Sequence, residues 1–414
     1  MLKVAGIYIS ANMISAAIPF LLLPLLTNYL TPAEYGIVTM FQILTNGILP
    51  LVGFSGDSAI NRQYFDKESS DFPNYVTNAL YILIVSSIAV YVLFIFSGSL
   101  IEKYSEFPKN WLWAVLLFAV GQKITEILLI IWRVQNKAIE YGIFRIIRTG
   151  LDMGLSIYFI IVFKRSWEGR IEGQLIAILF FALLALFYLY RGNYIKHGFN
   201  KLYVKSILKF GIPLIPHGLG AIIITYSDRI FITNMIGINE MGLYSVGFQI
   251  AMIMGLTQNS FNQAWQPWLY EKLKKDLPED KVRIVKFTYI YFVVILIVAA
   301  AITMIAPYIV HFMTSKEYSG AVPFIGWITF GFAFNGMYKM VVNYLFFLRK
   351  TFMLGMITLF TAITNIILNY YLIKINGSIG AAQSTAISFF IQFVVVWYIS
   401  SKYIKMNWFK IKRS

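Results

Sequence analysis

Cysteine is absent from this sequence, and charged residues are scarce. The absence of cysteine among the 414 residues excludes disulfides and thiol chemistry. Charged residues make up 13% of the chain, about half of the share found in soluble domains. Hydrophobic residues make up 58%, and the mean hydropathy is +0.68. This composition indicates an integral membrane protein.

Acidic residues are fewer than basic ones. The chain has 19 acidic and 35 basic residues, which gives a net charge of +16. A strongly basic balance can indicate a nucleic-acid partner, but here the basic residues lie in short segments between apolar runs. That arrangement follows the positive-inside rule of membrane proteins, so we expect no nucleic-acid partner.

Motifs of soluble enzymes are missing as well. The sequence has no Walker A lysine loop, so we do not expect it to hydrolyse ATP. Its three histidines, His197, His217 and His311, do not have metal-ligand spacing. No connection between the apolar runs is long enough for a soluble catalytic domain. We therefore expect a protein that is not an enzyme and that has no cofactor or metal site.

What the sequence does contain is about twelve long apolar runs. A helix needs about 20 apolar residues to cross a bilayer, and continuous runs favour helices over the alternating strands of a membrane barrel. We expect the first run to be a retained helix and not a cleaved signal. The expected spans are Val4–Leu30, Tyr35–Ala59, Tyr75–Phe96, Trp111–Trp132, Tyr141–Phe163, Glu172–Tyr190, Phe210–Ile236, Met241–Leu269, Val285–Phe312, Ala321–Phe347, Phe352–Ile373 and Gly380–Tyr403.

Lysine and arginine lie mainly on one side of these spans. With the N-terminus in the cytoplasm, the bias toward cytoplasmic segments is roughly three to one, so both termini are expected in the cytoplasm. The segment beyond Glu172–Tyr190 holds the longest connection, Arg191–Lys209, which is basic and partly amphipathic. For this connection we favour a solvated linker at the anionic leaflet over a specific ligand site.

A short repeat lies on both sides of this connection. Four positions recur with one common offset: Thr27, Asn28, Glu34 and Gly36 in the first copy, and Thr233, Asn234, Glu240 and Gly242 in the second. Because both copies fall at the same helix–turn–helix place, the repeat predicts two six-helix lobes related by an axis along the membrane normal. The expected division is an N-terminal lobe at residues 1–195, a basic cytoplasmic linker at 196–209 and a C-terminal lobe at 210–414.

Prolines mark the first span of each expected lobe. These are Pro19 and Pro24 in the first span and Pro213 and Pro216 in the seventh. An interior proline removes a backbone hydrogen bond and favours a kink, which suits helices that bend during transport. Prolines are also common in membrane helices for other reasons, so both interpretations stay open.

Charged residues inside the expected spans are the strongest functional signal. Each costs roughly 2.5–3.5 kcal/mol near the bilayer centre, so such residues face a protein interior or a water-filled cavity. Asp228 and Arg229 are adjacent and partly neutralise each other, and a functional role is favoured for this pair. Lys123 and Glu126 lie on one helix face and are expected to pair as scaffold. The remaining charges are Asp57, Arg62, Arg148, Asp152 and Lys339, and we expect one polar surface between the lobes.

The stretch from Lys209 to Lys272 carries a family resemblance. Its ordered motifs are Gly211-Ile212-Pro213, Pro216-His217, Ser227-Asp228-Arg229, Gly242-Leu243-Tyr244-Ser245 and Phe261-Asn262-Gln263-Ala264-Trp265-Gln266-Pro267. In this order they resemble the seventh and eighth transmembrane helices of Wzx-type polysaccharide flippases. Those proteins belong to the multidrug/oligosaccharidyl-lipid/polysaccharide (MOP) exporter superfamily. The hydropathy pattern agrees with this resemblance along the whole chain.

The resemblance implies an all-α, MATE-like fold with two lobes around a central cavity. It also implies a flippase that moves undecaprenyl-pyrophosphate-linked oligosaccharide to the outer leaflet of the bacterial inner membrane by alternating access. The product would be O-antigen, capsule or another exopolysaccharide. The implied partners are this substrate, membrane lipids, and a polysaccharide polymerase with its chain-length regulator.

Under this resemblance the charges inside the spans take specific roles. Arginine binds phosphate oxygens as a planar fork, and lysine binds them as a point charge. The candidate substrate-binding residues are Arg229, Asp228, Arg148, Lys339, Arg62 and Lys123. The candidate coupling carboxylates are Asp57, Asp152 and Glu126, with Asp228 as a further candidate. The sequence does not decide between Na⁺ and H⁺ as the coupling ion, nor between binding and scaffold roles for Arg148 and Lys339.

Aromatic and amide side chains are candidates for sugar contacts. The aromatic candidates are Tyr226, Tyr244, Trp265, Trp268 and Tyr338, and the amide candidates are Asn262, Gln263, Asn335 and Asn343. For the two tryptophans, anchoring at the membrane interface is the favoured alternative.

Three other functions compete with the flippase interpretation. A cation-coupled drug exporter of the same superfamily would share the fold, and the mixed sign of the embedded charges argues only weakly against it. A resemblance to lipid II flippases would imply fourteen helices, which is two more than this sequence is expected to have. A membrane polymerase or glycosyltransferase would need a large outer loop, which the short outer connections do not provide.

Overall fold

The computed structural model describes residues 20–65, 71–348, 350–404, 406 and 408, and these residues form helices and turns without any strand. They divide into two compact units, Met1–Tyr226 (the first unit) and Ser227–Ser414 (the second unit). The division lies inside helix α9 (Ile215–Met235), whereas the sequence suggested a linker at residues 196–209. The lobe boundaries predicted from the sequence therefore stay a prediction.

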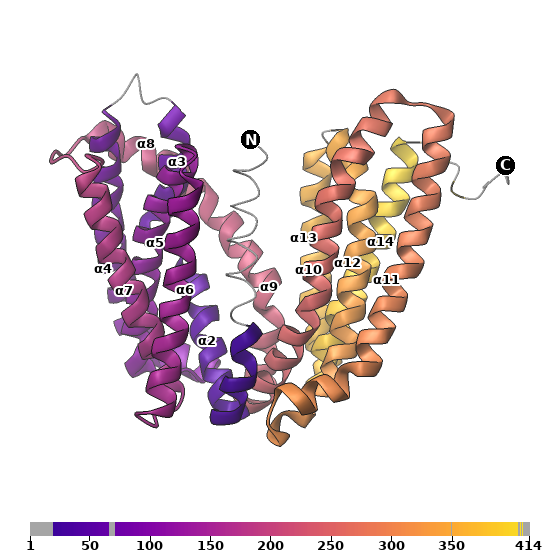
Figure 1. Ribbon diagram of the computed structural model, residues 1–414, viewed down its shortest axis with the longest axis horizontal. Coiled ribbons are helices and arrows are strands. Elements are labelled where there is room, and N and C mark those ends of the chain that lie inside the picture. Colours follow the sequence, from indigo (N-terminus) through magenta and orange to yellow (C-terminus); the bar gives the residue numbers. More distant parts are fainter. Residues whose placement is uncertain (1–19, 66–70, 349, 405, 407, 409–414) are drawn as a thin grey trace. The chain divides into compact units, whose positions relative to one another are not determined.

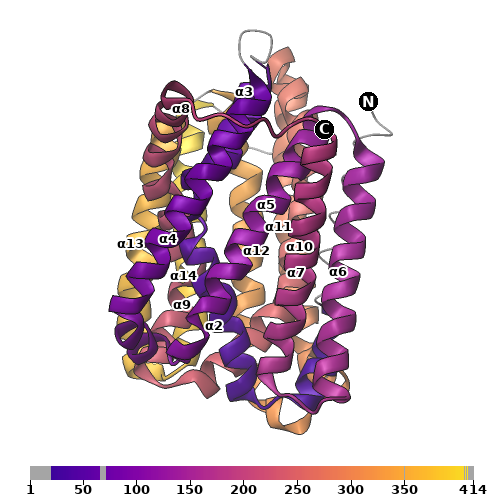
Figure 2. The ribbon, with the colours of Figure 1, turned by 90° about the vertical axis from the view of Figure 1, so that its left-hand side faces the viewer.

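The first unit consists of long helices that lie side by side, with α3 and α8 at one common end (Figures 1 and 2). Its elements after the short helix Phe20–Tyr29 are α2 (Pro32–Ile48), η1 (Val52–Ser55), α3 (Gly56–Gln63), α4 (Phe72–Ser105), η3 (Lys109–Trp111), α5 (Leu112–Val134), α6 (Ala138–Ile161), α7 (Trp167–Arg191), α8 (Lys201–Gly211), η4 (Ile212–Leu214) and most of α9.

The second unit is built around α12, which packs against α10, α11 and α14 (Figure 1). Its elements after the end of α9 are α10 (Ile238–Lys275), α11 (Pro278–Met313), η5 (Lys316–Ala321), α12 (Val322–Phe347), α13 (Thr351–Asn376) and α14 (Ile379–Tyr403). α10 and α11 are longer than the apolar runs predicted, so the basic segment between those runs is mostly helical.

The helices have the length and composition of membrane spans. Among the described residues, 7 helices are long and apolar enough to cross a bilayer, and up to 9 spans result if each of two bent helix pairs counts as one. α6 and α10, with 24 and 38 residues, are also long enough but carry more polar side chains. The first expected span begins at residues outside the described part of the chain. The predicted all-α membrane fold with about twelve transmembrane helices is confirmed.

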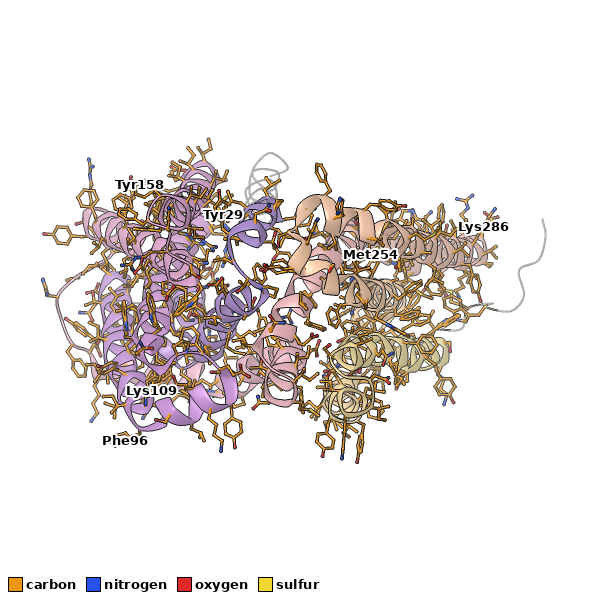
Figure 3. The ribbon with its side chains drawn as sticks, turned by 90° about the horizontal axis from the view of Figure 1, so that it is seen from below. Tyr29, Phe96, Lys109, Tyr158, Met254 and Lys286 are labelled. Carbon is orange, nitrogen blue, oxygen red and sulfur yellow. The ribbon has the colours of Figure 1, made fainter. Side chains whose placement is uncertain are left out.

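The outer surface of each unit is apolar. Phe96 on α4 is 84% exposed, and it lies on the outside of the first unit together with Tyr158 (Figure 3). Met254 on α10, in contrast, is fully buried within the second unit. Large exposed hydrophobic side chains are costly in water but not in lipid, so these surfaces are those of a multi-pass integral membrane protein.

Local sequence explains where α2 begins. The Thr31 side chain accepts the backbone N–H of Glu34, and the Glu34 carboxylate accepts the backbone N–H of Thr31. Pro32 occupies the first turn, where its missing N–H costs nothing. This reciprocal capping fixes the helix start close to where the second apolar run was predicted to begin.

The second expected span is broken, which the hydropathy pattern did not predict. α2 and the Val52–Gln63 segment meet at an angle of 54°. Gly53, Phe54 and Ser55 have φ angles of 76°, 46° and 55° at the break. Phe54 and Ser55 are not glycines, so packing must impose this left-handed backbone. The freed backbone N–H of Gly53 donates to Ser86 Oγ on α4 at 2.8 Å.

The seventh expected span is also bent, and its first residues contact the break in the second span. The segments Lys201–Gly220 and Thr225–Met235 meet at 55°, beyond both Pro213 and Pro216. A methyl group at Gly211 would lie 1.8 Å from the carbonyl oxygen of Phe54, so only glycine allows this contact. The two prolines thus lie in the segment before the bend and not at the bend itself. Pro19 lies outside the described residues.

Candidate functional site

The second unit contains a buried polar cluster around Asp228 on α9. The Asp228 side chain is 4% exposed. Its carboxylate accepts hydrogen bonds from the Tyr244 hydroxyl at 2.6 Å, the Thr385 hydroxyl at 2.8 Å and the Asn369 side-chain amide at 3.1 Å. The Ser227 hydroxyl also approaches it at 3.4 Å. These donors come from α9, α10, α13 and α14, so four helices converge on one carboxylate.

A second layer of polar side chains surrounds this carboxylate. Asn365 accepts hydrogen bonds from Ser227 and Asn369, both at 3.0 Å, and donates to Ser384 Oγ at 3.2 Å. The side-chain oxygen of Asn369 is buried and has no hydrogen-bond partner. Among the described residues no donor reaches this oxygen, and a buried acceptor without a donor is costly.

Arg229, the neighbour of Asp228 in the sequence, lies against two aromatic rings of α10. Its guanidinium lies 4.1 Å from the centre of the Phe248 ring and 5.5 Å from that of Tyr244. Tyr244 therefore contacts both charged residues, through its hydroxyl to Asp228 and through its ring to Arg229. The cation–π contacts with two rings of α10 stabilise the buried guanidinium.

The Asp228 cluster has the composition of a site for a monovalent cation or a proton. Within the described residues, no group of three or more His, Cys, Asp or Glu side chains could hold a metal ion. The cluster instead offers one carboxylate and several neutral oxygens, which are the ligands that hard cations prefer.

In the first unit, Lys123 pairs with Asp57 and not with Glu126. Lys123 Nζ on α5 lies 2.8 Å from Asp57 Oδ1 on α3, and both side chains are mostly buried. The predicted pairing of Lys123 with Glu126 within one helix is therefore wrong. The break before α3 brings Asp57 to the face of α5, and a closer partner on another helix replaces the weaker pair along the same helix.

The other charges of the first unit lie on α6 and its neighbours. Asp152 forms an ion pair with Arg170 of α7, and Arg170 also donates to Ser156 Oγ at 2.5 Å. Arg148 donates to Thr125 Oγ1 at 3.3 Å and interacts electrostatically with Glu126.

Two further arginines of this unit contact neighbouring elements. Arg170 lies between the expected spans Tyr141–Phe163 and Glu172–Tyr190, but it is 7% exposed because α7 begins at Trp167. Arg62 extends over the Phe210 ring at 5.6 Å, beside the end of α8.

Lys339 belongs to a row of polar side chains that joins α10 to α12. Lys339 donates to Asn259, Gln258 donates to Asn335 at 3.1 Å, and Asn343 donates to Asn262 at 2.8 Å. Three of the predicted sugar-binding residues, Asn262, Asn335 and Asn343, thus form hydrogen bonds between α10 and α12.

Most of the aromatic candidates pack between helices. Tyr244 and Trp265 are buried, and Trp268 packs against the same hydrophobic core as Trp265. Tyr226 accepts a hydrogen bond from Asn46 at 3.1 Å. The side chain of His217 lies outside the described residues. Packing explains the two tryptophans without a sugar contact.

Sequence reasoning missed the partners of Asp228 on α13 and α14. Thr361, Asn365 and Asn369 recur every fourth residue in an otherwise apolar span. Such spacing places them on one helix face, and a polar stripe inside a membrane helix signals a protein-facing contact. This stripe could have identified Asn365 and Asn369 on α13.

A family model and two curated relatives match this chain. Residues 1–272 match the family described as polysaccharide biosynthesis protein. An uncharacterized membrane protein of Haemophilus influenzae is 26% identical over 359 residues, which is 85% of each chain. The Lsg locus putative protein 1 of the same organism is 26% identical over 358 residues, which is 84% of this chain and 85% of the relative.

Solved transporter structures share the fold. An inward-facing multidrug resistance MATE family transporter of the MOP superfamily has a TM-score of 0.77 at 15% identity and covers 94% of both chains. The lipid II flippase MurJ in an inward closed conformation has a TM-score of 0.74 at 14% identity, with 96% of this chain and 87% of that chain covered. The resemblance seen in the sequence is thereby confirmed at the level of family and superfamily fold.

Proposed function

This chain belongs to the polysaccharide biosynthesis protein family, and we propose that it is a flippase for undecaprenyl-pyrophosphate-linked oligosaccharides. The substrate would cross from the cytoplasmic to the outer leaflet of the bacterial inner membrane and supply synthesis of O-antigen, capsule or another surface polysaccharide. The family match over residues 1–272 carries this proposal. The transporter fold and the charges inside the helices support it.

The charges of the first unit suit a substrate with a pyrophosphate headgroup. Arg148 donates to a neutral hydroxyl and interacts with Glu126, and its remaining N–H groups would be the donors for phosphate oxygens. Lys123 and Arg62 lie on α5 and α3, the helices next to the break at Gly53. Lys123 is held by Asp57, which supports a structural role for this lysine when no substrate is bound.

The Asp228 cluster is proposed as the coupling site. Its convergent oxygens would hold Na⁺ or a proton. Because α9, α10, α13 and α14 all contribute to the cluster, occupancy would change how tightly these helices hold together. The carboxylate and the unpartnered Asn369 oxygen support this assignment.

A gene deletion with two readouts tests the proposed function. We expect loss of surface polysaccharide together with accumulation of lipid-linked repeat units on the cytoplasmic side. Full-length protein in proteoliposomes should then translocate a labelled lipid-linked oligosaccharide. Intact polysaccharide combined with raised sensitivity to cationic drugs would contradict the flippase and favour a drug exporter. Normal export of single repeats with loss of long polymer would favour a polymerase.

A further inference from the structure

Helix α8 carries two parallel rows of side chains with different chemistry. Lys201, Lys205 and Lys209 follow each other at intervals of four residues. Val204 and Leu208 repeat at the same interval, each one position before a lysine, and Ile212 continues this row just past the end of α8. Residues four apart lie above each other on a helix, so a cationic row about 12 Å long runs beside an apolar row.

These two rows line an open groove. Its lining consists of Lys201, Val204, Lys205, Leu208, Lys209, Ile212 and Pro213, and its volume is about 560 Å³. Volumes of about 300–1,000 Å³ are typical of sites for small ligands. The three lysines and Pro213 are exposed, and Ile212 is 49% exposed. The groove therefore joins a positively charged edge to an apolar floor.

The lysines of the groove differ from the other basic residues near the helix ends. Lys196 lies 2.8 Å from Asp71, Lys272 lies 3.0 Å from Asp280, and Lys275 lies 2.6 Å from Glu271. None of the ion pairs in the described part of the chain involves Lys201, Lys205 or Lys209. No acidic residue occurs between Glu172 and Asp228 in the sequence. Three neighbouring positive charges without carboxylates favour an anionic ligand.

The opposite face of α8 is fixed to the first unit. Ile207 is fully buried in the core that α4, α5 and α7 share. Gly211 lies against the Phe54 carbonyl, and the Tyr203 hydroxyl accepts the backbone N–H of Asp71 at 3.0 Å. The Asn200 side chain caps the helix at 2.9 Å from the backbone nitrogen of Leu202. The groove is therefore held on a rigid support with its lysines facing outward.

We propose that this groove binds an anionic phospholipid of the surrounding membrane leaflet. Its phosphate group would bind the lysine row, and one acyl chain would lie along Leu208, Ile212 and Pro213. Each lysine close to a membrane surface contributes a factor of about five to the binding of an anionic lipid. The site is separate from the Asp228 cluster, and the proposal does not depend on the proposed transport function.

Native mass spectrometry of the full-length protein tests this proposal. Delipidated protein in detergent is incubated with equal amounts of phosphatidylglycerol and phosphatidylcholine that carry the same acyl chains. We expect the wild type to retain phosphatidylglycerol selectively. The triple variant K201Q/K205Q/K209Q should bind it roughly a hundredfold more weakly, while the corresponding triple arginine variant should bind it nearly as well as the wild type.

A matched triple variant controls for general loss of positive charge. Lys274, Arg283 and Lys286 are exposed cations on α10 and α11, away from the groove in sequence, and K274Q/R283Q/K286Q should leave phosphatidylglycerol binding within about twofold of the wild type. An equal loss in both triple variants would overturn the proposal, and so would no loss in the α8 variant. A clear preference of the groove for undecaprenyl pyrophosphate over phosphatidylglycerol would overturn it too.

Discussion

Asp57 and Asp152 in the first unit and Asp228 in the second are held by different kinds of partner. In the first unit, Asp57 pairs with Lys123 and Asp152 pairs with Arg170. In the second unit, Asp228 receives its hydrogen bonds from neutral hydroxyl and amide groups, while Arg229 stacks over Phe248. The carboxylates of the first unit each lie at ion-pair distance from a cation, whereas these hydrogen bonds to Asp228 come from hydroxyl and amide groups on three other helices. This difference separates scaffold charges from a candidate coupling site.

The largest expected effect is on transport and follows from changing Asp228. Asp228→Asn keeps the shape of the side chain but replaces one accepting oxygen by a donating amide group and removes the negative charge. We expect transport in proteoliposomes to fall by roughly tenfold or more, since about 1.4 kcal/mol of lost interaction already gives that factor. The amount of folded protein should change little.

Asp152→Asn serves as the comparison for this prediction. If Asp152 is scaffold, transport per folded molecule should stay close to that of the wild type. Equal transport losses in the Asp152 and Asp228 variants would remove the distinction between the two kinds of carboxylate.

The next effect is on stability and follows from breaking the pair of Arg170 with Asp152. Arg170→Met leaves a partly buried carboxylate without its cation, and removing one partner of a buried pair typically costs about 3–5 kcal/mol. Thermal unfolding in detergent should show a clearly lowered midpoint. The double variant R170M/D152L should recover most of the loss, because no unpaired charge then remains.

Arg165→Met is the matched control on the same helix junction. Arg165 pairs with Glu172, but its side chain is 52% exposed. Exposed pairs contribute about 0–1 kcal/mol, so the unfolding midpoint should hardly move. A loss as large as that of Arg170→Met would show that the burial of the pair is not what matters.

A smaller effect is expected for the pair of Lys123 with Asp57. Contacting residues show coupling energies of about 0.5–3 kcal/mol in double-mutant cycles. We therefore expect the double variant K123M/D57N to lose less stability than the sum of the losses in the single variants K123M and D57N. A coupling energy near zero would indicate that Lys123 is not held by Asp57 and would return it to the candidates for substrate binding.

The smallest effect concerns an exposed ion pair at the start of α4. The hydrogen bond from Lys196 holds the pKa of the Asp71 carboxyl below its usual value. A lowered carboxyl pKa in the folded state stabilises the protein above the usual pKa, and this contribution is lost as the pH falls through the lowered value. The unfolding midpoint of the wild type should therefore fall slightly more below pH 4 than that of Lys196→Gln. Identical pH profiles would contradict this assignment.

Several site residues could be predicted from the sequence because they are conspicuous in their local context. Asp228 stands out as a charge in an apolar run, and its burial and hydrogen bonds make it the centre of the candidate site. Its partners Asn369 and Thr385 were missed, because amides and hydroxyls are common in membrane helices and give a weak signal. Lys123 was identified, but its partner was chosen from its own helix.

The sequence by itself determined the class of protein, the position of most helices and the start of α2. These properties depend on local composition and on neighbours within one or two helical turns, which hydropathy and capping rules describe directly. The tertiary structure alone decided which charges pair and where the second span breaks. Lys123 and Asp57 are 66 positions apart, and Asn369 and Asp228 are 141 apart. Such contacts, like that of Gly211 with the Phe54 carbonyl, arise only when separate helices pack together.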